Sequence, residues 1–344
     1  MRRHFPITAA CLAVLAGAMT PAGHTVAGVK AAPALTRVVV ATGFLPNVEF
    51  APFYVAQDLG YYKAAGLDVT MNYDRVSNLM QAVENHQYTF ATASGDAVAI
   101  GKAQGANVTY VMAQYQKYPV GAMWLKNGGP TIKSPNHLKG KTIGISAPGS
   151  STDIGLRALQ KAGHLTANDV KVTAIGFTET EALINKQIDV AMTYIDNEPV
   201  QARALGYPVN VMAVSKYLKL VSNGVVASTQ MVKRNPATVQ AFVTATLKGL
   251  RYTLQHLNKA FAISMKRQPE VTAAKDLAIQ RQVLAARLKF QQPPKGHPLG
   301  WSSAAAWKTT ITFCRQLGLI KANTSVKSVY TNIFSNTFAE RAKL

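Results

Sequence analysis

Polar and aromatic residues suited to contacting a small molecule stand in short loops that follow predicted strands. Asn47 lies in the first such loop, and its side-chain amide offers both a donor and an acceptor to the edge of a ring. Phe44 and Phe50 stand on either side of it, where they can cover a planar ligand. A loop asparagine often bonds its own backbone instead, and one of the two phenylalanines can belong to the core. Asn47 and Phe50 are the first candidate ligand-binding residues.

The second loop contains Ser94, Gly95 and Asp96, at the end of a predicted strand and before a helical segment over 97–104. A glycine lets the backbone come close to a bound molecule. The free N–H groups at a helix start also attract polar or negative groups. Ser94 or Asp96 can equally cap the helix. Capping and ligand contact are compatible, so all three residues remain candidates.

The third loop contains Ser150, Ser151 and Thr152, between a predicted strand and a helical segment over 154–162. Three hydroxyl groups at a helix start suit an oxyanion or a polar substituent on a ring, and a plain helix cap accounts for only one of them. The segment is not a phosphate-binding loop, because the full Gly-x-x-x-x-Gly-Lys-Ser/Thr pattern is absent.

Tyrosines and carboxylates near the ends of other strands indicate the class of ligand. Tyr115, Tyr118 and Tyr194 suit a flat heterocycle, because a stacked aromatic pair adds about 0.5–1.5 kcal/mol beyond area burial. Each of these tyrosines can also lie at the edge of the core with its hydroxyl in water. Sulfonate or nitrate would make less use of aromatic rings.

Asp196 and Glu198 favour the same class of ligand, since a carboxylate attracts an amino-substituted or cationic ring and repels an oxyanion. Asn197, between them, and Asn223, directly before a predicted strand, complete the candidate ligand-binding residues. These residues together favour an aminopyrimidine.

The candidate loops require a scaffold of alternating strands and helices. Short apolar runs predict strands over 37–42, 67–73, 89–92, 108–115, 120–125, 141–146, 170–175, 189–194, 209–214 and 224–228. This alternation is typical of an α/β fold with a mostly parallel sheet, in which ligands bind outside the carboxyl ends of strands. The chain has 344 residues, 48% of them hydrophobic, which exceeds the usual size of a single core and predicts two lobes. From residue 236 onward the pattern is largely helical.

The N-terminus has the pattern of a secretory signal peptide over residues 1–27. Arg2 and Arg3 precede an apolar run over 7–19, and small residues lead to Ala27. This run is shorter than the roughly 20 apolar residues of a membrane-spanning helix. The mature protein is therefore expected outside the cytoplasm, with Cys314 as its one cysteine and no internal disulfide.

The charge is strongly basic and unevenly placed. The net charge is +21, with 17 basic and 13 acidic residues over 28–229 but 18 and 3 over 230–344. Clustered lysines and arginines would suit nucleic acid, but these stand mostly singly among apolar helical stretches. The pattern favours a solvated basic surface, suited to an acidic exterior or to contact with an anionic surface. We expect no nucleic-acid partner.

Several segments resemble the periplasmic substrate-binding proteins of ABC importers. The resemblance rests on the Asn47 loop followed by Ala-Pro-Phe-Tyr-Val-Ala, on Gly-Tyr-Tyr-Lys-Ala-Ala-Gly-Leu-Asp-Val over 60–69, and on Leu-Lys-Gly-Lys-Thr-Ile-Gly over 138–144. Within that superfamily the chain resembles the nitrate, taurine and sulfonate class. Pro46-Asn47, Phe50-Ala51-Pro52 and Ser94-Gly95-Asp96 are similar to the branch that binds pyrimidine precursors of thiamine and, in some members, riboflavin.

The resemblance implies the type II periplasmic binding fold, with two α/β lobes that close on a small molecule. The first lobe is expected over 28–120 and 225–344 and the second over 121–224, with crossings near 118–125 and 219–225. It also implies delivery of the ligand to an ABC permease. We expect a thiamine pyrimidine precursor as ligand, with riboflavin or a sulfonate-, taurine- or nitrate-type anion as alternatives, and we expect a monomer without a cofactor.

An enzyme of the same fold is the alternative from another functional class. A related enzyme makes a thiamine pyrimidine with its own histidine and a cysteine-rich motif. This sequence lacks such a motif, its histidines stand far along the chain from the candidate loops, and it shows no metal-ligand spacing. The sequence therefore predicts binding without catalysis.

Overall fold

The computed structural model describes residues 34–74, 78–320 and 328–341. The chain divides into two units, Met1–Ala34 and Leu35–Leu344, and every helix and strand below belongs to the second. The predicted signal peptide over 1–27 lies outside the described residues. Among the helices described, none combines the length and the apolar character needed to cross a membrane.

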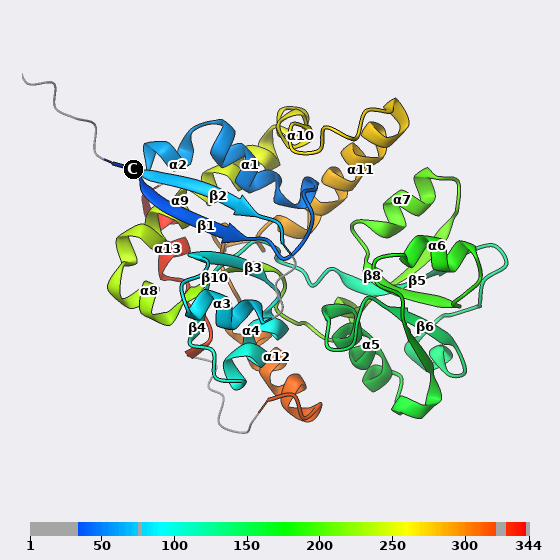
Figure 1. The fold of residues 1–344 in the computed structure, drawn as a ribbon. Coiled ribbons are helices and arrows are strands. Elements are labelled where there is room, and N and C mark those ends of the chain that lie inside the picture. Colours follow the sequence, from blue (N-terminus) through cyan, green and yellow to red (C-terminus); the bar gives the residue numbers. More distant parts are fainter. Residues whose placement is uncertain (1–33, 75–77, 321–327, 342–344) are drawn as a thin grey trace, which may run out of the picture. The chain divides into compact units, whose positions relative to one another are not determined.

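The first sheet has five strands in the order β2-β1-β3-β10-β4 (Figure 1). β1 (Thr36–Ala41) pairs in parallel with β2 (Leu67–Asn72) and β3 (Phe90–Ala93). β10 (Gly224–Ser228) runs antiparallel to β3 and β4 (Val108–Ala113). Successive residues of β10 face different cores, because side chains alternate across a strand: Val225 and Ala227 pack on one side and Val226 on the other.

The second sheet repeats this plan with the order β7-β6-β8-β5-β9. β6 (Thr142–Ile145) pairs in parallel with β7 (Lys171–Ala174) and β8 (Val190–Tyr194). β5 (Val120–Leu125) runs antiparallel to β8 and β9 (Val209–Ala213). Each sheet therefore has four strands in one direction and one in the other, so the mostly parallel α/β architecture predicted from the sequence is confirmed.

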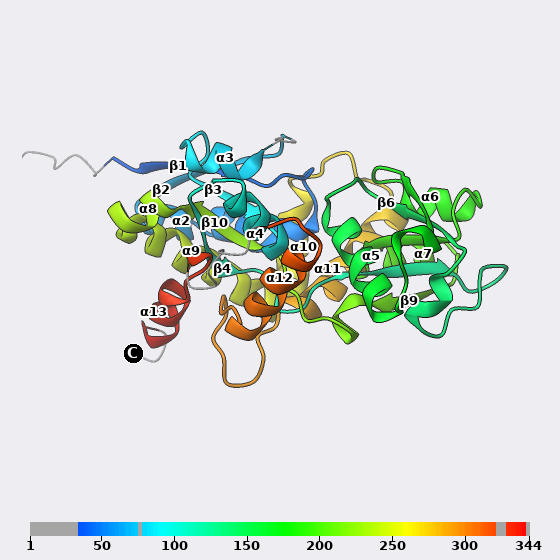
Figure 2. The same cartoon turned by 90° about the horizontal axis from the view of Figure 1, so that it is seen from below.

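Helices cover both faces of the first sheet. One core packs beneath α1 (Ala51–Asp58), α2 (Tyr61–Ala64), α9 (Pro236–Gln255), α10 (Leu257–Met265) and α13 (Ile333–Arg341). The opposite face packs beneath α3 (Leu79–Glu84), α4 (Gly95–Ala103) and α12 (Ala304–Gln316). Figure 2 shows α12 beside α4. The short α8 (Thr229–Arg234) follows β10 and leads into α9.

The second sheet has α5 (Ser151–Ala162) over one face and α6 (Glu179–Ile184) with α7 (Glu198–Ala204) over the other. α11 (Ala274–Gln291) packs both against α7 and against the 3₁₀ turn η1 (Val48–Phe50) that precedes α1 (Figure 1). α11 therefore contacts helical elements that follow strands of both sheets.

Serines determine where several helices begin, because their side-chain oxygens accept hydrogen bonds from the free N–H groups of the first turn. Four such caps are formed by Ser94 on α4, Ser150 on α5, Ser228 on α8 and Ser303 on α12. The first two caps lie at the carboxyl ends of β3 and β6 and place their loops where the sheets meet.

Candidate functional site

A cavity of about 530 Å³ lies between loops of the two sheets, and we call it the cleft. Residues within 42–50, 78–81 and 92–104 line it from the first sheet, and residues within 146–152, 177–179 and 194–198 from the second. This volume is typical of a site for a small organic molecule. Among the predicted site residues, the cleft gathers Phe50, Ser94, Ser150, Ser151, Thr152, Tyr194, Asn197 and Asn223. It does not gather Asn47, Gly95, Asp96, Tyr115, Tyr118 or Asp196.

The hydroxyl groups before α5 form one hydrogen-bonded cluster. Ser150 Oγ accepts a hydrogen bond from Ser146 Oγ at 3.0 Å, and Thr152 Oγ1 accepts one from the Ser146 backbone N–H at 2.9 Å. Ser151 Oγ donates across the cleft to Ser94 Oγ at 3.0 Å and to Asp96 Oδ2 at 3.3 Å. Hydroxyls both donate and accept, so this cluster can bind polar substituents of either kind.

Asp96 and Tyr118 support this cluster from behind. Asp96 is 1% exposed, and its burial raises the pKa of the carboxyl to about 6. Tyr118 is buried, and its Oη donates to the Ser151 carbonyl oxygen at 3.0 Å. Both residues therefore hold Ser151 in place without lining the cleft.

The structure indicates a role for Gly95 that differs from the predicted one. A Cβ atom at Gly95 would lie 2.4 Å from Val221 Cβ, much closer than side chains pack. The glycine therefore permits close packing of α4 against the segment before β10.

Arg287 of α11 joins three parts of the chain in a buried ionic cluster. Its Nη1 lies 3.2 Å from Glu49 Oε2 and 3.5 Å from Asp196 Oδ2, and it donates to Tyr115 Oη at 2.7 Å. The Arg287 side chain is 3% exposed and that of Asp196 is fully buried. Asp196 and Tyr115 therefore belong to this cluster. The interpretation of Asp196 as a carboxylate facing the ligand needs correction, because its charge is directed at Arg287.

A chain of hydrogen bonds links that cluster to the cleft surface. Asn223 Nδ2 donates to Glu49 Oε1 at 3.2 Å, and Tyr194 Oη donates to Asn223 Oδ1 at 3.4 Å. Glu49, Tyr194 and Asn223 all line the cleft. A ligand that binds here would contact groups whose orientation the buried arginine fixes.

Two further carboxyls line the cleft beside α6 and α7. Glu179 is 5% exposed, and burial together with the charge of Glu198 raises its pKa to about 8. Burial also raises the pKa of Glu198, which accepts hydrogen bonds from the Tyr194 backbone N–H at 3.1 Å and from Asn197 Nδ2 at 2.6 Å. Near neutral pH a protonated Glu179 offers an O–H donor to a ligand.

An aromatic pair contributes the apolar side of the cleft. The rings of Phe44, after β1, and Phe177, after β7, meet edge to face with centroids 5.1 Å apart. Phe177 is 50% exposed, so its ring has surface available for a flat ligand. Phe50 is 1% exposed and packs edge to face against Phe53 and Tyr54, so most of its ring belongs to the core.

Asn47 has a structural role in the loop before α1. Its Oδ1 accepts a hydrogen bond from the Glu49 backbone N–H at 2.6 Å, as expected from the alternative in which a loop asparagine bonds its own backbone. This turn orients Glu49 toward Arg287, so Asn47 acts on the cleft through its neighbour.

The charged groups of the cleft do not suit an anion. Glu49, Glu179, Glu198 and Arg287 are the acidic and basic side chains that line it within the described residues. Arg287 already faces Glu49 and Asp196. No group of three or more histidine, cysteine or acidic side chains is placed to hold a metal ion in the described part of the chain.

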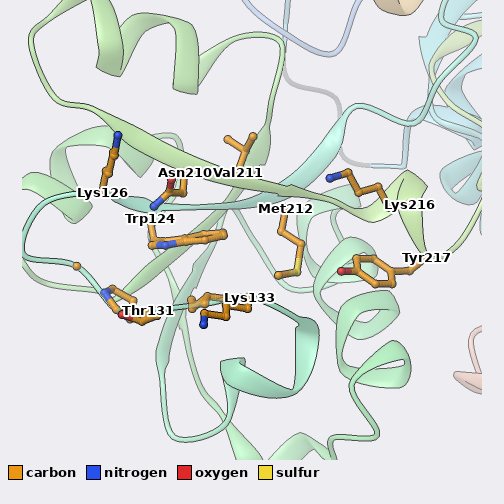
Figure 3. Close-up of a pocket in the computed structure, with 12 residues that line it drawn as sticks. Trp124, Lys126, Thr131, Lys133, Asn210, Val211, Met212, Lys216 and Tyr217 are labelled. Carbon is orange, nitrogen blue, oxygen red and sulfur yellow. The ribbon is translucent and has the colours of Figure 1, made fainter.

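A separate cavity of about 380 Å³ lies on the second sheet, where it is lined by residues of β5, β9 and the loop after β5. Figure 3 shows the side chains of Asn210, Lys126 and Lys133 around the Trp124 indole, with Lys216 and Tyr217 at the other end of the cavity. It contains none of the predicted site residues, so the cleft remains the candidate functional site.

Sequence reasoning missed Arg287, Glu49, Phe177 and Glu179. Arg287 carried the clearest available signal, because it stands on the same helical face as the apolar Val283, Leu284 and Leu288. A charged residue inside an apolar stripe predicts a buried ionic partner. The other three stand in loops or at a helix start with no distinguishing pattern.

Comparison with known proteins places this fold and cleft in a family. The model of the family described as NMT1/THI5 like matches residues 47–260. The riboflavin-binding protein RibY of Chloroflexus aurantiacus is 37% identical over 310 residues, which cover 89% of this chain and 88% of that protein. The chain belongs to the NMT1/THI5-like family. A formylaminopyrimidine-binding protein of Halalkalibacterium halodurans is 22% identical over 287 residues, 81% of this chain and 85% of that protein.

Other members and structural neighbours of this NMT1/THI5-like chain differ in their activities. A protein of Saccharomyces cerevisiae named 4-amino-5-hydroxymethyl-2-methylpyrimidine phosphate synthase THI5 is 23% identical over 249 residues, 68% of this chain and 72% of that protein. The periplasmic aliphatic sulphonate binding protein SsuA of Escherichia coli has a TM-score of 0.68 at 15% identity, covering 88% of this chain and 93% of that one. The predicted type II periplasmic binding fold and the predicted relationship to solute-binding proteins are confirmed.

Proposed function

We propose that this chain binds riboflavin in the cleft and delivers it to a membrane permease. The observation that carries the proposal is the composition of the cleft, which places aromatic surface beside a cluster of hydroxyl and amide groups and has its arginine already paired. Riboflavin joins a flat three-ring system to a polyol chain and carries no charge at neutral pH. Its two halves match the two sides of the cleft.

The aromatic side suits the ring system. Phe44, Phe177 and Tyr194 line the cleft from three separate segments, and stacking on such rings adds about 0.5–1.5 kcal/mol beyond area burial. Asn197 and Asn223 can bond the polar edge of the ring, and the hydroxyls of the Ser150 loop can bond the polyol chain.

An anion is disfavoured by the same groups. A sulfonate would require a cation to offset its desolvation, whereas Arg287 faces two carboxylates and Glu198 adds a further acidic group. The similarity to the sulphonate-binding protein is 15% in sequence and supports the fold alone. The 37% identity to the riboflavin-binding protein supports riboflavin over the thiamine pyrimidine precursor expected first, since the pyrimidine-binding relative is 22% identical.

We also propose that the chain acts without chemical turnover, as the solute-binding component of an ABC importer outside the cytoplasm. The riboflavin-binding protein above, which is named as a binding protein, supports this role. In this proposal the protein has two lobes. Residues 28–120 and 225–344 form the first lobe, and residues 121–224 form the second. A ligand that contacts both lobes shifts the population toward the closed state, which a monomer presents to the permease.

Riboflavin fluorescence provides the test. Titration of the protein into riboflavin should quench the flavin emission with one site per chain. Phe177→Ala should weaken binding about 2- to 12-fold through the lost ring contact. Tyr207→Ala is the matched control, because Tyr207 is 40% exposed and stands outside the residues that line the cleft. Equal affinity of both variants, or no quenching by the wild-type protein, would refute the proposed site.

A further inference from the structure

A second large cavity lies on the other side of the segments that connect the two sheets. It has a volume of about 620 Å³ and is lined by residues 113–118 after β4, residues 215–222 before β10, and residues 294–309 of the C-terminal part. We call it the basic cavity. Ser222 lines the basic cavity and the next residue, Asn223, lines the cleft, so one extended segment separates the two.

The lining of the basic cavity is positively charged. Lys117, Lys216 and Lys219 line it with exposed side chains, and no acidic side chain lines it within the described residues. Lys216 also lines the cavity around Trp124, together with Lys126 and Lys133 (Figure 3). Acidic side chains outnumber basic ones in the lining of the cleft, which has three carboxyls and one paired arginine. The basic cavity therefore attracts a ligand of the charge that the cleft disfavours.

A buried hydroxyl in the basic cavity has an unused hydrogen-bonding capacity. Ser222 is 3% exposed, and its Oγ has no hydrogen-bond partner in the described part of the chain. The Ser222 carbonyl oxygen accepts a hydrogen bond from Tyr110 Oη at 3.2 Å, which holds the backbone at this residue. Buried polar groups are almost always paired, so the unpaired hydroxyl of a residue that lines the cavity lacks a partner that a ligand atom can provide.

Two other features of the wall suit an aromatic anion. The rings of His297 and Trp301 stack with centroids 3.6 Å apart and 18° between their planes, which gives a flat aromatic surface. The Trp301 carbonyl oxygen accepts a hydrogen bond from Gln116 Nε2 at 3.1 Å, which holds this surface in place. The first turn of α12, a helix of 13 residues, contributes Ala305 and Ala306 and brings its positive dipole end to the cavity.

We propose that the basic cavity is a second binding site, for a small organic anion in which a phosphate or carboxylate group is attached to an aromatic body. The lysines and the start of α12 bind the anionic group, Ser222 Oγ donates to it, and the Trp301 surface covers the aromatic part. An occupant would contact both connecting segments together with the C-terminal part.

The test uses 1-naphthyl phosphate and 2-naphthoate as aromatic anions, with inorganic phosphate and neutral 1-naphthol as comparisons, in calorimetric titrations of the full mature chain. Both aromatic anions should bind one site, and the two comparison compounds should bind at least tenfold more weakly. The double variant Lys216→Gln/Lys219→Gln should bind the aromatic anions at least fivefold more weakly. Lys248→Gln/Lys259→Gln removes the same charge at two exposed positions elsewhere and should leave binding unchanged.

Ser222→Ala distinguishes a ligand-binding hydroxyl from one that is merely buried. We expect this variant to fold with wild-type circular dichroism and to bind 1-naphthyl phosphate about 3- to 10-fold more weakly. Three outcomes would overturn the proposal: equal affinity in the two lysine double variants, affinity for inorganic phosphate that matches the aromatic anions, or unchanged affinity in Ser222→Ala. None of these readouts depends on what the cleft binds.

Discussion

Replacement of Arg287 by methionine should destabilise the protein strongly at neutral pH. The guanidinium lies 3.2 Å from Glu49 and 3.5 Å from Asp196, and its side chain is 3% exposed. At an effective dielectric constant of about 20, each of these contacts contributes about 5 kcal/mol of gross attraction, part of which offsets the desolvation of the three charges. Removal of one partner of a buried ion pair costs about 3–5 kcal/mol. We expect a loss of that size in the free energy of unfolding at pH 7.

The loss should shrink in acid. Burial raises the pKa of both Glu49 and Asp196, and removal of the arginine removes the charge that most opposes that rise. A raised carboxyl pKa in the folded state contributes stability that is present below the unfolded pKa and is lost as the pH rises through the folded pKa. As the pH falls from 7, protonation therefore removes uncompensated charge that destabilises the variant.

Urea unfolding followed by circular dichroism at pH 5 and pH 7 measures both effects. Arg281→Met is the matched control, because Arg281 is an exposed residue of the same helix that bonds Asn258 and should change stability by less than about 0.5 kcal/mol. Addition of Glu49→Gln and Asp196→Asn to Arg287→Met should restore most of the stability. A loss below about 1 kcal/mol, or an equal loss at both pH values, would refute the reasoning.

Three further variants test the surroundings of the cleft. Glu179→Gln should raise Tm at pH 9 and change it much less at pH 5 in scanning calorimetry, because the destabilisation by Glu179 grows as the pH rises from the ordinary glutamate pKa of 4.5 to the folded pKa of about 8; equal shifts at both pH values would contradict this. Gly95→Ala should cost about 1–3 kcal/mol in urea unfolding, through a Cβ placed 2.4 Å from Val221 Cβ, and Val221→Ala should recover part of that loss. Asn47→Ala should lower the free energy of unfolding by about 1 kcal/mol, because it removes the hydrogen bond to the Glu49 N–H, and should change riboflavin affinity less than twofold. A loss of affinity without a loss of stability would show that Asn47 contacts the ligand directly.

The strands were predictable because their signal is local. All the predicted strands form, with ends shifted by one or two residues, as at Tyr115, which follows β4 rather than ending it. Serine caps such as Ser94 and Ser150 were predictable for the same reason, since they act on N–H groups within three residues. The loops at these caps therefore appear where the sequence placed them.

The ionic cluster was not predictable from local pattern. Asp196 looks like a free carboxylate in sequence, because the cation that pairs with it stands 91 positions later, at Arg287. Gly95 likewise suggests a close approach of ligand, whereas the group that approaches is Val221, from a distant segment. In both cases tertiary packing determines which group a residue contacts, and that group cannot be inferred from the spacing of residues along the chain.

Selectivity between neutral heterocycles and anions tests the central claim most directly. Isothermal titration of the mature protein with riboflavin, taurine, an alkanesulfonate and nitrate, at one pH and ionic strength, compares the two classes in a single assay. The charges that line the cleft predict tight, one-to-one binding of riboflavin and at least 100-fold weaker binding of each anion at the same site. Anion binding that equals riboflavin binding and is displaced by riboflavin would contradict the account.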